Sequence, residues 1–394
     1  MELQASRLGE VLDVQSGFAF KRERFSELEG LPLIRIRDLA GTTTETKYEG
    51  PYREEFLVEP GDYLIGMDGE FRCHIWRGPR ALLNQRVCRL RSFRESVYPP
   101  YIYYGIQKYL KDIEDHTSFA TVKHISSRQV ENIVMPIPSL TEQRRVVELL
   151  TRAESIVRMR REAEAKAKDI IPALFVDMFG DPGNTDSNGS SGGRREAGSF
   201  CQLGEAADVV SGVAKGRKLK GKVTREVPYL RVANVQAGAL DLSEMKYIPA
   251  TEAEIDELAV RAGDVLLTEG GDFDKVGRGA LLEADIGECI HQNHVFRVRV
   301  HPGKLVPEYF AAFLQTDAAR QYFLKAAKKT SNLASINMTQ LKNLPLATPD
   351  FRRQAAFRER FQTCRSLEKQ QSKAAGIAEG SFQALLAGVF GEGR

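Results

Sequence analysis

The sequence predicts an α+β protein built from two copies of one mixed α/β design. Residues 125–181 reappear at 336–392 with a constant displacement of 211 residues, so that Ile125 recurs as Ile336. In each copy, short apolar runs precede a long helical pattern. These observations predict two repeated globules separated by a pair of long antiparallel helices, a coiled coil, with a pseudo-twofold internal repeat.

The opening part of each copy is expected to be a globule of short strands followed by a helix. LGEVLDVQSG at Leu8 answers LGEAADVVSG at Leu203, and β-branched runs bounded by Gly, Pro and Asp follow in both copies. The expected strands begin at Leu33, Asp62, Val87, Tyr229, Asp264 and Val295, and the expected helices cover 99–110 and 307–327. The globules therefore occupy residues 1–138 and 200–349, each an ordinary domain of about 140 residues.

A long helix is expected after each globule, over residues 139–180 and 350–394. Ser139 with Glu142 suggests a capping box, and Asp350 stands at the corresponding start of the second helix. About 40 helical residues rise roughly 60 Å, so each helix needs a partner along its length. The preferred partner is the other copy, packed antiparallel; the alternative is that each helix folds onto its own globule.

Both helices present the same apolar stripe in the same register, which predicts the interface between them. The predicted interface residues are Val146, Leu150, Ile156, Ile171, Leu174, Met178, Phe357, Phe361, Leu367, Phe382, Leu385 and Val389. Between the first helix and the second globule, residues 181–199 are dominated by Gly, Ser and Asn. This segment is expected to be a flexible linker.

Composition favours an intracellular protein. Apolar residues make up 42% of the 394 residues, enough to bury real cores. The five cysteines are scattered without metal-ligand spacing, which indicates reduced thiols and no metal site. No apolar run approaches the roughly 20 residues that span a bilayer, and the N-terminus lacks a signal pattern, so the protein is expected to be cytoplasmic.

Charge is informative through its distribution, because the net charge is only +3. Residues 215–225, KGRKLKGKVTR, contain six basic side chains and no acid, and a smaller basic group occupies the equivalent place in the first copy. A solvated loop is one interpretation, and the recurrence favours an edge that contacts phosphates. The predicted phosphate contacts are Lys21, Arg22, Arg24, Lys215, Arg217, Lys218, Lys220 and Lys222.

Three patterns resemble catalytic or metal motifs but lack required residues. GRKLKGKV at 216–223 has Val223 where a phosphate-binding loop needs a hydroxyl for magnesium. YPPY at 98–101 has Tyr98 where an amino-methyltransferase needs Asn or Asp to hold the target amino group. His291 and His294 are spaced as HxxH without a third ligand, so they are expected to be surface or groove histidines. No catalytic residue is therefore predicted.

The order and duplication of these blocks resemble the specificity subunits of type I restriction-modification enzymes. The resemblance covers nearly the whole chain and is carried by PIPSLTEQ at Pro136, by the helix endings on Phe-Gly, and by the block from Gly61 to Leu90, with GDYLIGMDGEF and ALLNQRVCRL. The second copy departs from the pattern, with TPDFRRQ at Thr348 in place of the Leu-x-Glu-Gln turn.

The resemblance implies a subunit that reads DNA without catalysing a reaction. Each globule would be a target-recognition domain for one half of a bipartite double-stranded sequence, with the helix pair setting the spacer. Two methyltransferase subunits would dock on the helices and restriction ATPase/endonuclease subunits would join them. S-adenosylmethionine, ATP and Mg would be bound by those partners and no cofactor by this chain. The candidate base-reading residues are Arg72, His74, Arg77, Lys123, His124, Lys275, Arg278, Asn332 and Asn337.

Two other classes of protein remain possible from the residues alone. A coiled-coil scaffold without DNA specificity would explain the helices but leaves the recurrent basic loops unexplained. A stand-alone DNA-modifying enzyme would need a carboxylate cluster or a cofactor loop, and no such pattern is found in the sequence.

Overall fold

Strand pairing in the protein follows the matched blocks of the sequence. The computed structural model describes residues 5–117, 123–180, 199–273, 275–329 and 334–391. β10 (Val87–Arg91) lies between β2 (Asp13–Ser16) and β7 (Tyr63–Gly66), and β8 (Cys73–Ile75) completes an antiparallel four-stranded sheet. The later copy has the same order, β13 (Ala207–Ser211), β20 (Val295–Val300), β16 (Val265–Thr268) and β18 (Gly279–Leu281). The matched blocks therefore form equivalent sheets.

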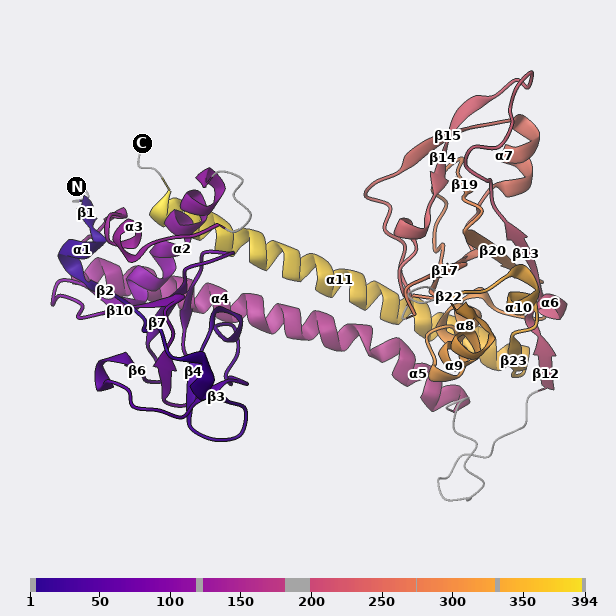
Figure 1. Ribbon diagram of the computed structural model, residues 1–394. Coiled ribbons are helices and arrows are strands. Elements are labelled where there is room, and N and C mark those ends of the chain that lie inside the picture. The colour runs from indigo at the N-terminus through magenta and orange to yellow at the C-terminus, as the bar shows by residue number, and fades with distance from the viewer. Residues whose placement is uncertain (1–4, 118–122, 181–198, 274, 330–333, 392–394) are drawn as a thin grey trace. The chain divides into compact units, whose positions relative to one another are not determined.

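The chain forms two compact units, Met1–Arg161 with Ala374–Arg394, and Glu162–Lys373. Figure 1 labels many of their elements along the chain. The other elements before the long helices are β1 (Ala5–Arg7), α1 (Leu8–Val11), η1 (Arg22–Arg24), β3 (Phe25–Ser26), β4 (Leu31–Ile34), η2 (Ile36–Asp38), β5 (Lys47–Tyr48), η3 (Glu54–Phe56), β6 (Leu57–Val58), β9 (Ala81–Leu83), α2 (Pro99–His116), α3 (Ser127–Glu131) and β11 (Val134–Pro136).

The second unit adds the corresponding elements of the later copy. They are β12 (Ser199–Gln202), α6 (Leu203–Ala206), β14 (Arg225–Leu230), η4 (Val232–Asn234), β15 (Lys246–Ala250), α7 (Glu252–Leu258), β17 (Gly270–Gly271), β19 (Ile290–His291), α8 (Pro307–Phe313), α9 (Asp317–Ala326), β21 (Lys328–Lys329), β22 (Ala334–Ser335), α10 (Met338–Lys342) and β23 (Pro345–Thr348). β4 pairs in parallel with β9, and β14 pairs in parallel with β19. The segment expected to be a linker lies outside the described residues, except for Ser199, which begins β12.

Two expected strands end earlier than the apolar pattern indicates. After β4, the Asp38 carboxylate accepts the Arg35 backbone N–H at 2.9 Å and starts the short helix η2. After β14, the Asn234 side chain accepts the Arg231 N–H at 2.9 Å and starts η4. Such a side-chain acceptor three residues ahead turns the backbone away from strand pairing. The arginines expected inside strands therefore stand at strand ends.

The first long helix is divided into two parts. α4 (Leu140–Lys168) ends before Asp169, and α5 (Ile170–Phe179) follows. Pro172 has no N–H to donate, and its ring clashes with the carbonyl of Lys168 in a continuous helix. The prediction of one unbroken helix over residues 139–180 was therefore wrong at this point. α11 (Phe351–Phe390) is a single helix of 40 residues.

Segments of both long helices contribute to the core of each unit. In the first unit, Val146 and Leu150 of α4 and Phe390 of α11 share one hydrophobic cluster with α2. In the second unit, Phe175 of α5 and Phe357 of α11 share a cluster with α8. Neither long helix therefore folds only onto the globule that precedes it, which was the alternative arrangement.

Most of the predicted interface residues are buried or half-buried in these clusters. They are Val146, Leu150, Ile171, Leu174, Met178, Phe357, Phe361, Phe382 and Val389. Three were assigned wrongly: Ile156, Leu367 and Leu385 are 49%, 37% and 42% exposed. Val157 is buried in place of Ile156, because the 3.6-residue period moves the buried position from Leu150 to residue 157.

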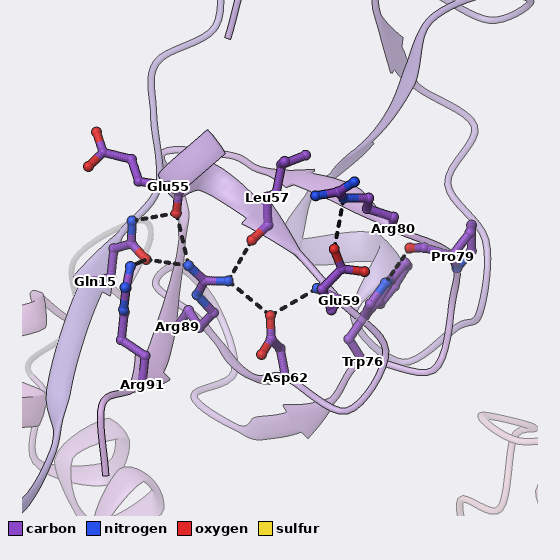
Figure 2. Close-up of polar contacts among 10 residues, drawn as sticks. All are labelled: Gln15, Glu55, Leu57, Glu59, Asp62, Trp76, Pro79, Arg80, Arg89 and Arg91. Atoms are coloured by element: carbon purple, nitrogen blue, oxygen red, sulfur yellow. Dashed lines mark hydrogen bonds and ion pairs between the residues drawn. The ribbon is translucent and has the colours of Figure 1, made fainter. Parts of the chain in front are cut away.

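A buried arginine on β10 connects the first sheet to the chain segment that contains Glu55 and Leu57. Arg89 on β10 donates to the backbone carbonyls of Leu57 (2.5 Å) and Glu55 (2.9 Å), and it contacts Asp62 at 3.0 Å. The nitrogen that donates to the Glu55 carbonyl, Nη2, also donates to Gln15 Oε1 at 2.7 Å (Figure 2). A buried guanidinium is tolerated only where such acceptors replace water. Arg89 is therefore a structural residue.

The second sheet has the same arrangement around Arg297 on β20. Arg297 donates to the carbonyls of Ala259 (2.6 Å) and Glu257 (3.0 Å). The neighbouring Arg299 pairs with Asp264 at 2.7 Å. In the first sheet the carboxylate of Asp62 pairs with Arg89, whereas in the second sheet the carboxylate of Asp264 pairs with Arg299. The two backbone carbonyl acceptors of Arg297 correspond to those of Arg89. Equivalent buried arginines connect the sheets to equivalent chain segments.

Candidate nucleic-acid interface

The first unit contains a cleft rich in arginine, with a volume of about 580 Å³. Its lining residues are Phe20, Arg22, Phe25, Arg35, Ile36, Arg37, Asn84, Gln85 and Arg86, which we call the arginine cleft. They come from the η1 segment, from the turn that starts η2, and from residues 84–86, which join β9 to β10. Strand ends and turns therefore supply the polar groups of the cleft.

Its four arginines are only partly neutralised. Arg37 lies 3.4 Å from Glu45, and Arg86 lies 3.4 Å from Asp68; both arginine side chains are 56% exposed. Arg22 and Arg35 form no salt bridge with the residues that the structure describes. Exposed ion pairs contribute little energy and exchange partners readily. The cleft is therefore a concave surface of positive charge, with amide groups beside it, and is suited to an anionic polymer.

Sequence reasoning identified only one of these arginines. Arg22 was predicted as a phosphate contact and lines the cleft, whereas Lys21 and Arg24 are exposed nearby in the chain but are not among its lining residues. Arg35 and Arg37 were missed because their block was assigned to a strand. The Asp38 acceptor that starts η2 was the signal that could have placed them in a turn.

Three further candidates of the first unit, Arg72, His74 and Arg77, lie on or beside β8. Arg72 and Arg77 are exposed, and Arg72 lies 3.7 Å from Glu70. His74 is half-buried, and burial, with the nearby charge of Arg72, lowers its pKa. A neutral imidazole can both donate and accept a hydrogen bond at a base edge.

Two further candidates lie close to the turn that contains Asp68. His124 Nδ1 is 2.6 Å from the Asp68 carboxylate, and the same carboxylate lies near Arg86. Lys123 instead donates its Nζ to the Glu114 carbonyl at 2.6 Å. Asp68 therefore links His124 to the edge of the arginine cleft, and Lys123 holds the end of α2.

In the second unit, the lysines of the basic loop and Arg217 have different environments. Lys215, Lys218, Lys220 and Lys222 are exposed, as expected for phosphate contacts. Arg217 was predicted wrongly, because it donates to both oxygens of Glu254 (2.6 and 2.9 Å) and to the Pro249 carbonyl. This side-chain hydrogen bonding from Arg217 lowers the pKa of Glu254 to about 2. Arg217 thus fastens the loop to α7.

The other candidates of the second unit differ in the contacts that their side chains make. Lys275 pairs with Asp272, and Arg278 lies 3.4 Å from Gln236. Asn337 was predicted as a base reader but caps α10, because its side chain accepts the Gln340 N–H at 2.8 Å. A capping side chain is committed to its helix and is not free to read a base. Asn332 lies outside the described residues.

His291 corrects the prediction of a surface histidine. It is fully buried, and Nδ1 lies 2.7 Å from the Val295 carbonyl, which can only accept a hydrogen bond. Nδ1 therefore carries the proton, and Nε2 has no partner among the described residues. Burial lowers the pKa of His291 to about 4. The equivalent residue in the first unit is Leu83, which is buried as well.

Replacing His291 by leucine is expected to remove part of the pH dependence of stability. The folded state holds the neutral imidazole, so the stabilisation is complete above pH 6.5 and is lost as the pH falls toward 4. At pH 5 the wild-type second unit should lose about 2 kcal/mol relative to pH 7.5 from this group. Urea unfolding of wild type and His291→Leu at both pH values measures the difference. Equal pH dependence in the two proteins would contradict the assignment.

Sequence comparisons with known proteins agree on one class of relatives. A model of the type I restriction modification DNA specificity domain matches residues 2–167. The chain is 26% identical to the EcoBI specificity subunit of Escherichia coli over 96% of this chain and 84% of that protein. It is 21% identical to the EcoKI specificity subunit of Escherichia coli K12, over 95% and 85%.

Solved structures show a shared fold. The S subunit from M. genitalium superposes with a TM-score of 0.57 at 12% identity, over 99% of this chain and 96% of that one. A chain from a study of complex assembly in a type I R-M system superposes with a TM-score of 0.60 at 17% identity, over 98% and 97%.

Along nearly its whole length the chain is similar to specificity subunits of type I restriction-modification systems, and residues 2–167 match the model of their DNA specificity domain. Among the described residues, no helix is long and apolar enough to cross a membrane.

Proposed function

We propose that the chain is the sequence-specific DNA-recognition subunit of a type I restriction-modification complex. Each globular part reads one half of a bipartite duplex, and the paired long helices set the spacer and dock two methyltransferase subunits. The observation that carries the proposal is the arginine cleft, where exposed cations stand beside amide side chains. Cations bind phosphates of any sequence, whereas amides and arginine discriminate base edges.

In this proposal the subunit contributes positioning and no catalysis. S-adenosylmethionine, ATP and Mg are bound by the methyltransferase and restriction ATPase/endonuclease partners, and this chain binds no cofactor. Support comes from the two incomplete motifs, at Tyr98 and Val223. In the structure, Tyr98 is the N-cap residue of α2 and its ring packs under Arg144, with the guanidinium carbon 4.6 Å from the ring centre. It is thus placed as a structural residue.

The basic loop offers a direct test of phosphate binding. Replacing Lys218, Lys220 and Lys222 by alanine should weaken binding of the assembled complex to DNA of any sequence. Each lost phosphate contact should reduce the slope of log K against log salt by about 0.9. Titrations of specific and unrelated duplexes between low and moderate salt measure both effects.

A control variant keeps the same loss of charge elsewhere in the second unit. Alanine at the exposed Lys246, Lys325 and Lys342 removes three cations from scattered positions. This variant is expected to keep a salt slope closer to that of wild type. A slope unchanged by the loop variant would mean that these lysines belong to a solvated loop and do not contact phosphates.

A further inference from the structure

One short turn occupies the same place in both units and is built in the same way. Residues 84–86 (Asn-Gln-Arg) connect β9 to β10, and residues 292–294 (Gln-Asn-His) connect β19 to β20. Both turns follow a strand that pairs in parallel with an earlier strand, β4 or β14. We call them the paired turns.

Their backbones are held by matching hydrogen bonds. Gln85 N–H donates to the Phe18 carbonyl and Asn293 N–H donates to the Val213 carbonyl, each at 2.9 Å. The last carbonyl of each turn is also used: Met67 N–H donates to Arg86, and Glu269 N–H donates to His294, again at 2.9 Å. The backbone groups that fix each turn are therefore satisfied. Asn84 Oδ1 also accepts the Arg86 N–H at 3.3 Å, so its amide NH2 and the Gln85 side chain are the groups left to interact elsewhere in the first turn.

A glycine presses against each turn from the preceding strand region. A Cβ on Gly17 would lie 2.1 Å from the Asn84 carbonyl oxygen, and one on Gly212 would lie 1.9 Å from the His291 carbonyl oxygen. No side chain fits such an approach, so the recurrent Ser-Gly sequence is explained by contact with the paired turns. The close approach holds each turn in one position.

The side chains of the paired turns project from these fixed backbones. Gln85, Arg86 and His294 are exposed, and Asn84, Gln292 and Asn293 are half-buried. An acidic residue holds the third side chain of each turn: Asp68 lies 3.4 Å from Arg86, and Glu269 lies 2.6 Å from His294. In the first unit, all three residues of the turn line the arginine cleft.

We propose that the paired turns are base-reading segments, each contacting base edges in one half of the bipartite duplex. The proposal rests on the proposed function of DNA recognition. Asn and Gln can donate to and accept from adenine at once, and Arg can donate twice to guanine. A backbone fixed before binding lowers the entropy lost when those contacts form. Because the residues differ between the turns, the two half-sequences differ as well.

Phosphate binding is the competing role for the same side chains. A phosphate contact would need only the charge of Arg86 and would leave the neutral amides without a function. It would also act equally on every duplex, whereas a base contact acts on one position. The amide side chains in both turns favour base reading, and this difference can be measured.

The test exchanges the turns within the complete complex of this chain with its methyltransferase subunits. The triple variant Asn84→Gln, Gln85→Asn and Arg86→His gives the first turn the residues of the second. Selection from randomised duplexes should show a changed preference at one or two base pairs of one half-site, by roughly 10- to 100-fold. The other half-site and the spacer should be unchanged.

The reciprocal variant, Gln292→Asn, Asn293→Gln and His294→Arg, should change the other half-site alone. These substitutions introduce side chains that the equivalent backbone already carries, so folding should be preserved. Arg80→Gln is the matched control for charge, because Arg80 is exposed, pairs with Glu59 and is not among the lining residues of the arginine cleft. It should leave both half-sites unchanged.

The possible results distinguish the role proposed for the paired turns from the proposed function of DNA recognition. An unchanged preference in both exchange variants, with binding intact, overturns the role of the paired turns and leaves DNA recognition standing. Weaker binding to all duplexes alike also overturns it and indicates phosphate contacts. If the wild-type complex shows no preference for any sequence, the proposed function itself fails.

Discussion

Replacing Arg89 by methionine is expected to destabilise the first unit by about 3–5 kcal/mol. The change leaves the Leu57 and Glu55 carbonyls without their guanidinium donor and leaves Asp62 without its partner. Methionine fills much of the same volume but offers no donor, so the Leu57 carbonyl loses its side-chain donor, and Glu55 and Asp62 keep only the bonds from Gln15 Nε2 and the Glu59 N–H. Urea unfolding of the chain, followed by hydrogen exchange of β10 amides, measures the loss and places it in the first unit.

Arg91→Met is the matched control for Arg89→Met. Arg91 lies on the same strand, is exposed, and contacts Gln15 Oε1 at 3.0 Å. Its loss should cost less than about 1 kcal/mol, because an exposed contact is readily replaced by water. Similar costs for the two variants would show that water reaches the Arg89 site and that the carbonyls do not depend on the guanidinium.

The repeat made much of this framework predictable. The strands expected at Val87 and Val295 are β10 and β20, and each occupies the same place in the order of its sheet. The buried arginines did not stand out, since Arg89 and Arg297 lie within apolar runs and resemble outward-facing residues. Alternation predicts which side of a strand a residue faces, but it does not reveal acceptors supplied by distant loops.

The candidate site was predictable only in part, for the same reason. The basic loop was visible because residues 215–225 contain no acid, but the partner of Arg217 is Glu254, which lies 37 residues away. The cap role of Asn337 was visible locally, because Gln340 follows three residues later as in a capping box. The cleft required three separated segments to meet, which single-sequence patterns do not show.

The helix stripe shows where periodicity reaches its limit. A stripe written from matched positions places Ile156 and Leu385 inside, whereas the structure buries Val157 and partly buries Leu386. One residue moves a side chain by about 100° around a helix, so a small drift exchanges a buried position for an exposed one. Aligning the two copies gave matching positions on the two long helices, but it did not give the face of each helix that is buried.

Lengthening both long helices is expected to change the spacer of the recognised sequence. If the helices pack antiparallel as proposed, four residues added to each lengthen the pair by about 6 Å, at 1.5 Å per residue. Because one base pair of B-DNA advances 3.4 Å, the half-sites should move apart by roughly two base pairs. The insertion leaves the paired turns and the arginine cleft untouched, so both half-sequences should be unchanged.

Sequencing of methylated DNA from cells expressing the altered subunit with its methyltransferase partners would show the new spacer directly. Four residues are close to one helical turn, so the inserted segment keeps the apolar stripe nearly aligned. The same insertion in α4 alone is the control, because it shifts one helix against the other and should reduce methylation without defining a new spacer. The old spacer together with altered half-sites in the doubly lengthened protein would mean that the helices do not set the separation, and the antiparallel pairing would then have to be abandoned.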